Sequence, residues 1–397
     1  MKINYGQNVY DKKEINAVLK TLKNGTQMGN SVKKFEISIS KIFSKKYGLM
    51  VNSGSSALIL ALKVLNLKNG SEVITPCLNF GTAVSSIILS NLKPIFVDCK
   101  SDTLQIDPDK IVRKISNNTK VLLIPNLIGN IPDWIKIKSI AKKYNLKIIE
   151  DSADTLGAKI KNNSTGKFSD ISITSFYGSH IISCAGNGGI FLTNNLKYFE
   201  KAKVLRSWGR MSSLIQDSEN IKKRLGIKLK GYDYDRKFVF SEVGYNFEPS
   251  EIGASFGLEQ LKKFKKFANI RNRNFNLHFK FFKNLNKYFI IPKIDKYTKT
   301  NFLAYPIILN KNLNFKRKEF QLYLEEKGIQ TRPIFSGNIL RHPAFYSLRS
   351  KKNKLNEFKN SDFIMKNGLL IGCHQGLSTK DISYIHSTIL KFKKIAS

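Results

Sequence analysis

The hydrophobic residues in the first half of the chain fall into short runs separated by amphipathic stretches. Seven of these runs have the length and composition of buried β-strands, and each ends near a turn residue. They begin at Leu49, Glu72, Pro94, Lys120, Leu146, Ile171 and Gly189. Helical patterns lie between them, at 55–65 after a serine cap and at 133–144 after Pro132. The alternation predicts an α/β fold with a mostly parallel central sheet covered by helices on both faces.

The pattern changes after Trp208. A polar, charged insertion occupies roughly 211–236, and a long helix is predicted from about 249 to 275. One hydrophobic core stops growing at roughly 250–300 residues, so 397 residues indicate more than one domain, with the boundary inside the long helix. The predicted parts are an N-terminal arm (1–20), a large domain (21–255) and a smaller C-terminal α/β domain (256–397).

The formal net charge of +38 could attract nucleic acid, a membrane surface or an anionic small molecule. Its lysines are spread along the whole chain, which favours a generally solvated, basic surface. The segment 261–275 has the composition of an RNA-binding stretch, but Leu261, Phe264, Phe267 and Ile270 recur every three residues and predict one buried helix face. We therefore expect no nucleic-acid partner, and a basic nucleic-acid binder remains the alternative from another class.

The four cysteines are scattered, without any C-x-x-C pair, so the sequence indicates neither a disulfide framework nor a metal site. The N-terminus is polar, and no apolar run reaches the roughly 18 residues of a membrane span. We expect a cytoplasmic protein without a membrane partner.

Two segments at predicted strand ends could bind a ligand. Small residues from Asn52 to Ala57 offer backbone N–H groups and hydroxyls at a helix start, which suit a phosphate, although such a turn is often only structural. After the fifth strand, Asp151 could keep a pyridine nitrogen protonated or simply cap a helix. A dinucleotide-binding dehydrogenase is disfavoured, because no G-x-G-x-x-G follows the first strand.

Five segments follow one another in a diagnostic order. They are NSGSSAL, LNFGTAV, EDSADTLGA, SFYGSH with GNGG, and GYNFEPSEIGASFGLEQL. Their order and spacing resemble the DegT/DnrJ/EryC1/StrS family of nucleotide-sugar aminotransferases, from about residue 20 to the C-terminus. The resemblance implies a fold-type-I enzyme that uses pyridoxal 5′-phosphate (PLP) or its amine form, pyridoxamine 5′-phosphate.

The resemblance also implies roles for single residues. Gly54, Ser55 and Ser175 would bind the cofactor phosphate, and Phe80 would lie against the ring. Asn246 would reach the phosphate of a neighbouring subunit, which implies a homodimer. Taken alone, Phe80 could be a core aromatic and Asn246 a turn residue.

The catalytic position departs from the family pattern. Ordinary members carry there, five residues after the serine of the SF motif, the lysine that holds the cofactor as an imine, whereas this chain has His180. An imidazole shuttles protons near neutral pH but cannot form that bond. Asp151 would pair with the pyridine nitrogen, and Asp154 stands where aminotransferases carry a glutamine or histidine near the ring hydroxyl.

The 3-dehydratase branches of the family make the same replacement, and the segments SWGR and TRPIFSGNILRHPAFY resemble those branches. The resemblance implies C3 dehydration of a nucleotide-diphosphate 4-keto-6-deoxyhexose in deoxysugar and O-antigen biosynthesis, with glutamate as amino donor and a noncovalently bound cofactor. His180 would remove a proton from the cofactor. Iron–sulfur members supply cysteines from the insertion after SWGR, and none occurs in that insertion here, so we expect no cluster.

Three polar residues in the TRPIFSGNILR segment could hold the sugar or its diphosphate, since arginine suits that geometry. They are Arg332, Asn338 and Arg341, and surface solvation would explain them as well.

A sugar aminotransferase is the alternative function among enzymes, and the missing lysine disfavours it. A non-catalytic cofactor-binding regulator is the alternative outside them.

Overall fold

The computed structural model describes residues 2–215, 219–225, 227–392 and 395. Its central sheet has the strand order β1-β9-β8-β5-β4-β2-β3. The strands are β1 (Tyr47–Val51), β2 (Glu72–Pro76), β3 (Lys93–Val97), β4 (Thr119–Pro125), β5 (Lys147–Asp151), β8 (Ile171–Ser175) and β9 (Gly189–Thr193). Only β9 runs antiparallel to its neighbours, and the other pairings within this sheet are parallel. All seven predicted strands and the α/β class are confirmed.

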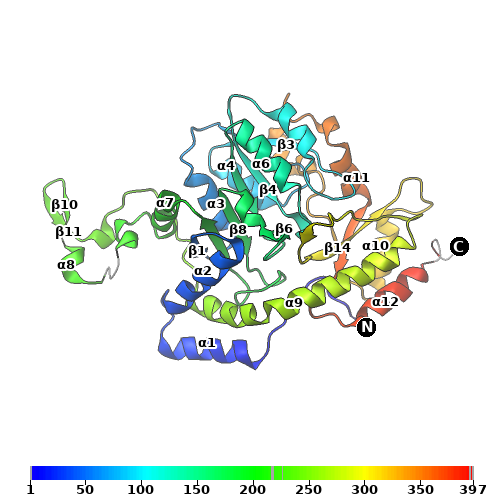
Figure 1. Ribbon diagram of the computed structural model, residues 1–397, viewed down its shortest axis with the longest axis horizontal. Coiled ribbons are helices and arrows are strands. Elements are labelled where there is room, and N and C mark those ends of the chain that lie inside the picture. The colour runs from blue at the N-terminus through cyan, green and yellow to red at the C-terminus, as the bar shows by residue number, and fades with distance from the viewer. Residues whose placement is uncertain (1, 216–218, 226, 393–394, 396–397) are drawn as a thin grey trace.

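Helices cover both faces of this sheet (Figure 1). Apolar residues of α3 (Gly54–Lys63), α4 (Gly81–Leu89) and α7 (Leu196–Arg206) share one core with one face of the strands. On the other face, α6 (Trp134–Lys143) packs with fully buried Trp134, and α2 (Asn30–Phe43) packs beside β1 and β9. The hydrophobic runs are therefore apolar on both sides of the pleat, as a doubly covered sheet requires.

The predicted helix starts are built by side-chain caps. Ser53 accepts a hydrogen bond from the Ser56 amide at the start of α3. Asp133 accepts one from the Lys136 amide at the start of α6. Both caps satisfy N–H groups that a first helical turn leaves unpaired. Helix α1 (Lys12–Asn24) begins with a capping box built on Asp11.

One long helix, α9 (Glu251–Lys283), runs from beneath the central sheet to the C-terminal helices (Figure 1). Phe267 is buried with α2, and Leu261 and Phe264 pack partly buried in the same cluster, so most of the predicted apolar face is confirmed. The helix continues eight residues beyond its predicted end, because Phe282 is buried in the second core. The helix passes straight through the predicted domain boundary at 255/256, and the division into arm and domains stays a prediction.

The second core surrounds an antiparallel sheet in the order β12-β14-β16-β15. Its strands are β12 (Phe289–Ile290), β14 (Ala304–Leu309), β15 (Thr331–Pro333) and β16 (Gly368–Gly372). Helices α9, α10 (Arg317–Glu326) and α12 (Thr379–Leu390) cover one face, and α11 (Lys359–Asn367) packs on the other. A small third sheet joins β13 (Thr298–Lys299), β6 (Lys159–Ile160) and β7 (Asn163–Ser164).

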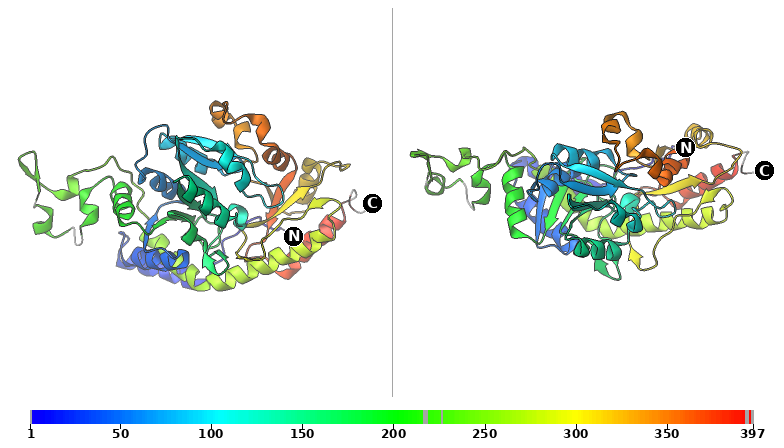
Figure 2. Two further views of the ribbon diagram at one scale, coloured as in Figure 1. Left: turned by 45° about the horizontal axis from the view of Figure 1, so that its top comes forward. Right: turned by 90° about the horizontal axis from the view of Figure 1, so that it is seen from above.

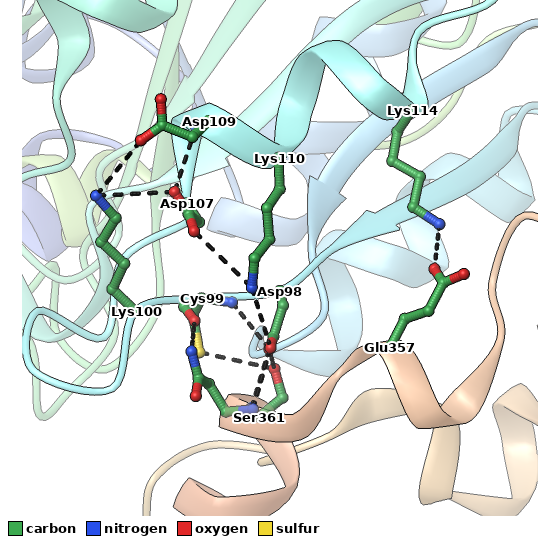
Figure 3. A network of polar contacts seen from close by, with 10 residues as sticks. Asp98, Cys99, Lys100, Asp107, Asp109, Lys110, Lys114, Glu357 and Ser361 are labelled. Carbon is green, nitrogen blue, oxygen red and sulfur yellow. Dashed lines mark hydrogen bonds and ion pairs between the residues drawn. The ribbon is translucent and has the colours of Figure 1, made fainter.

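A buried carboxylate fixes the second sheet against the first (Figure 3). Asp98, after β3, accepts hydrogen bonds from the backbone N–H of Ser361 at 3.0 Å and from its hydroxyl at 2.7 Å. Lys110, in the short helix α5 (Pro108–Ile111), lies 3.7 Å from the same carboxylate. The start of α11, which packs on the second sheet, is therefore held at the end of β3.

The insertion after α7 projects away from the body in Figure 1 and in both views of Figure 2. Its described part contains α8 (Ile221–Arg224) and the hairpin of β10 (Ile227–Leu229) and β11 (Tyr232–Tyr234). Residues 216–218 and 226 of the predicted insertion lie outside the described residues. Tyr232 at the hairpin tip is 76% exposed. No helix in the described ranges is long and apolar enough to cross a membrane.

Candidate active site

A cavity of about 710 Å³ opens at the carboxyl ends of β5 and β8, the edge where open α/β sheets bind ligands. The central sheet and the start of α3 form one wall. Strand β15 and the loop after it form the other. Eight residues predicted for the site line this cavity: Gly54, Ser55, Phe80, Asp151, Asp154, Ser175, His180 and Arg332.

The start of α3 lies tightly against the end of β8. A Cβ atom on Gly54 would stand 2.8 Å from the Cβ of Ser175, so only glycine permits this approach. The first backbone N–H groups of α3 and the Ser55 side chain therefore border the cavity. A helix N-terminus with adjacent hydroxyls attracts a phosphate through its unpaired N–H groups and its dipole.

Asp151 ends β5 with its carboxyl group in the cavity wall. The carboxylate accepts a hydrogen bond from the Ala153 amide at 3.0 Å, and no cation pairs with it among the described residues. Burial raises the pKa of Asp151 from 3.8 to about 6, with a further rise from the charge of Glu150. A buried carboxyl group without a counter-ion suits a ligand that brings a positive charge.

Asp154 lies on the same wall. It accepts a hydrogen bond from the Ile128 amide at 2.8 Å. Burial raises the pKa of Asp154 to about 7, and the nearby charge of Asp151 raises it further. Two carboxyl groups therefore face the same part of the cavity. Because the charge of one raises the pKa of the other, ionising both together is unfavourable.

His180 follows β8 and lies half-buried in the cavity wall. Its backbone amide donates to the Tyr177 carbonyl at 2.9 Å, and Arg271 donates from Nη2 to the His180 carbonyl at 3.2 Å. The Nδ1 atom lies 3.4 Å from the Ser175 carbonyl oxygen. Burial lowers the pKa of His180 from 6.5 to about 4, and the Arg271 charge lowers it further, so the ring is uncharged near neutral pH.

Phe80 stands at the start of α4 and is 57% exposed, which is unusual for a core aromatic. Its ring borders the cavity and contacts Phe335 edge to face, with centroids 6.1 Å apart. An exposed aromatic face beside a carboxyl pair and a helix N-terminus matches the three parts of PLP, namely ring, ring nitrogen and phosphate. The residues present therefore fit this cofactor.

Three predicted site residues lie outside the cavity lining. The Asn338 side chain is fully buried: its amide donates to Asp362 at 2.7 Å, and its oxygen accepts from Cys77 and from the Leu340 amide. Arg341 is bound to the same aspartate through Nη2 at 2.7 Å. These two side chains are engaged in fixing the loop after β15. Asn246 is exposed, and its predicted contact would be with a second subunit.

Sequence reasoning missed several cavity residues. Tyr5 comes from the N-terminal arm, and Phe335 and His342 come from the same segment as Arg332. For Tyr5 the only signal was an aromatic residue in a polar stretch before the first helix. The described residues that line the cavity include no lysine, in agreement with the replacement at position 180.

Known proteins resemble the chain over nearly its full length. A family model described as the DegT/DnrJ/EryC1/StrS aminotransferase family matches residues 8–390. The dTDP-4-dehydro-2,6-dideoxy-D-glucose 3-dehydratase of Saccharopolyspora spinosa is 31% identical over 377 residues, which cover 92% of this chain and 80% of that protein. The UDP-4-amino-4,6-dideoxy-N-acetyl-beta-L-altrosamine transaminase of Campylobacter jejuni is 29% identical over 393 residues, covering 98% and 96%.

A crystal structure of GDP-4-keto-6-deoxymannose-3-dehydratase with a trapped PLP–glutamate geminal diamine has a TM-score of 0.86 to this structure. The identity is 26%, and the match covers 98% of this chain and 100% of that one. With the cavity described above, these matches define the class as PLP-dependent enzymes with a fold-type-I α/β architecture. Within it, the chain belongs to the DegT/DnrJ/EryC1/StrS family. Its relatives include dehydratases and transaminases at similar identity, so similarity alone does not separate the two reactions.

Proposed function

We propose that this enzyme removes the C3 hydroxyl group of a nucleotide-linked 4-keto-6-deoxyhexose in deoxysugar biosynthesis, with PLP and glutamate and without an iron–sulfur cluster. One observation carries the proposal: an imidazole occupies position 180, and no lysine lines the described cavity. Without a lysine amine, no side chain among the described cavity residues can form an imine with the aldehyde carbon of the cofactor. A noncovalently held cofactor is the consequence.

His180 is the proposed base. The Ser175 carbonyl oxygen can only accept a hydrogen bond, so the proton of the neutral ring belongs on Nδ1. The lone pair of Nε2 would then be free to accept a proton from a cofactor held in the cavity. Because the pKa of His180 is lowered to about 4, the basic form prevails at neutral pH.

When bound, the cofactor supplies an electron sink that lets a neighbouring C–H bond ionise and a hydroxyl group leave the adjacent sugar carbon. Asp151 would hold the proton on the ring nitrogen, and the charge pair would offset the cost of ionising a buried carboxyl group. The start of α3 would bind the phosphate, and Phe80 would cover one face of the ring.

The substrates are proposed from charge and from the relatives. Arg332 is the only arginine or lysine among the described cavity residues, so it is the candidate for the diphosphate. Glutamate is proposed as amino donor, because a related dehydratase was trapped with a PLP–glutamate adduct. Asn246 is proposed to contact the cofactor phosphate of a second subunit, in a homodimer.

The absence of a cluster is proposed from the cysteines. The chain has four, all buried and unpaired, and none lies in the insertion after Trp208. An iron–sulfur cluster needs several thiolates at one place.

Product analysis tests the proposed reaction. The enzyme would be incubated with PLP, glutamate and a panel of nucleotide-linked 4-keto-6-deoxyhexoses, and the sugar products would be identified by mass spectrometry. We expect a 3-deoxy-4-keto sugar with release of ammonia. A stable 4-amino sugar from every substrate would reject dehydration in favour of transamination.

A further inference from the structure

The N-terminal segment from Ile3 to Gly6 is threaded between the two sheets. Ile3 pairs with Ile329 in a parallel bridge, donating to the Gly328 carbonyl and accepting from the Gln330 amide. Asn4 is held through its carbonyl, which accepts a hydrogen bond from His374 at 3.0 Å. This segment is therefore fixed to the C-terminal sheet by its backbone.

The end of the segment reaches the loop that carries His180. A Cβ atom on Gly6 would stand 2.9 Å from the Cβ of Ser179, the residue before His180. The Tyr5 amide donates to the Gln330 side chain at 2.9 Å. Because Tyr5 is anchored on both sides, its side chain enters the cavity from a fixed backbone.

The Tyr5 ring lies close to charges of both signs in the cavity. The Arg332 guanidinium is 5.7 Å from the ring centroid, and the charge of Asp154 is close enough to act on the phenol. Burial, with the Asp154 charge, raises the pKa of Tyr5 above its ordinary value of 10, so the phenol keeps its proton. Within the described part of the chain, no residue forms a hydrogen bond with this hydroxyl group.

We propose that Tyr5 is a substrate-positioning residue whose hydroxyl group donates a hydrogen bond to an oxygen of the hexose. The inference rests on the proposed substrate class. A sugar hydroxyl can accept a hydrogen bond from the Tyr5 phenol, which has no partner among the described residues, while Asp154 beside it is left to the cofactor. A carboxylate ligand fits less well at this end, because Asp151 and Asp154 face it there.

The Tyr5→Phe variant tests the inference. It removes the donor and keeps the ring over Arg332 and all the backbone hydrogen bonds of the segment. The matched control is Tyr10→Phe, because Tyr10 lies on the same arm, is 54% exposed and is absent from the cavity lining. The two half-reactions would be followed separately. The reaction with glutamate, without sugar, would be followed by cofactor absorbance. Sugar consumption would be measured with enzyme that already carries the amine form of the cofactor.

We expect Tyr5→Phe to lower kcat/KM for sugar consumption about tenfold, the loss expected for one hydrogen bond in a closed site. The glutamate half-reaction and the melting temperature should stay at the wild-type values, and Tyr10→Phe should match the wild type throughout. Unchanged sugar consumption in Tyr5→Phe would overturn the inference. An equal slowing of both half-reactions would also overturn it, since that result indicates a structural role.

The Tyr5 experiment can be decided whether or not the enzyme proves to be a dehydratase. The Tyr5 test measures disappearance of the sugar substrate, whichever product forms. Accumulation of a 4-amino sugar by the wild type would reject dehydration, and the ratio of the two consumption rates would still decide the role of Tyr5.

Discussion

Replacing Asp151 by asparagine removes the proposed partner of the ring nitrogen with little change in shape. Burial without a counter-ion moves the pKa of Asp151 from 3.8 to about 6, which corresponds to roughly 3 kcal/mol of unfavourable ionisation free energy. The same poor solvation strengthens a charge pair with the protonated ring nitrogen, so we expect the pair to be worth an energy of the same order, roughly 3 kcal/mol, or about a hundredfold in rate. Asparagine cannot supply the charge.

The assay is the half-reaction with glutamate, followed through cofactor absorbance without any sugar. We expect Asp151→Asn to slow it about a hundredfold. The control is Glu150→Gln: Glu150 is the neighbouring buried carboxylate, and it accepts from Ser172 at 2.7 Å and from Ser152 at 2.8 Å, away from the cavity lining. That variant should lose thermal stability and react with glutamate within about twofold of the wild-type rate. The reasoning is refuted if Asp151→Asn reacts as fast as the control.

Two further predictions concern the phosphate site and the base. Gly54→Ala should weaken cofactor binding at least tenfold in an absorbance titration, because its Cβ would meet Ser175 at 2.8 Å. The control is Gly29→Ala, which lies outside the cavity lining and whose Cβ would meet only ordinary contacts at 3.5 Å, so it should bind normally. Equal affinities of the two variants would contradict the packing argument. In a pH–rate profile of sugar consumption, protonation of His180 should reduce the rate only as pH falls through about 4, since its folded pKa lies below the ordinary value. A loss centred near 6.5 would show an unperturbed imidazole.

The sheet could be predicted from the sequence because its strands are buried on both faces. Such strands are continuous apolar runs ending at turn residues, as the buried run from Val121 to Pro125 in β4 illustrates. The end of α9 was harder to predict, because Phe282 follows a basic stretch and is buried only by the second core. The extent of that helix depends on packing between segments far apart in the chain.

The candidate site divides in the same way. Asp151 and His180 end or follow strands, so local pattern and family resemblance were enough to find them. Tyr5 reaches the cavity only because the arm threads between the sheets, which no local pattern encodes. Arg332 and Asn338 are six residues apart in one segment, yet only Arg332 faces the cavity, since a contact with Asp362 holds the other away.

Ammonia release by wild type and by His180→Lys, measured side by side with the same nucleotide ketosugar and glutamate, tests the central claim most directly. The wild type should release one ammonia for each sugar consumed. An imidazole cannot form an imine with the cofactor, so we expect the sugar to lose its C3 hydroxyl group first and its nitrogen to be released by hydrolysis as ammonia. The lysine variant can anchor the cofactor covalently and should release almost none. Ammonia release at the wild-type rate by the lysine variant would contradict the account.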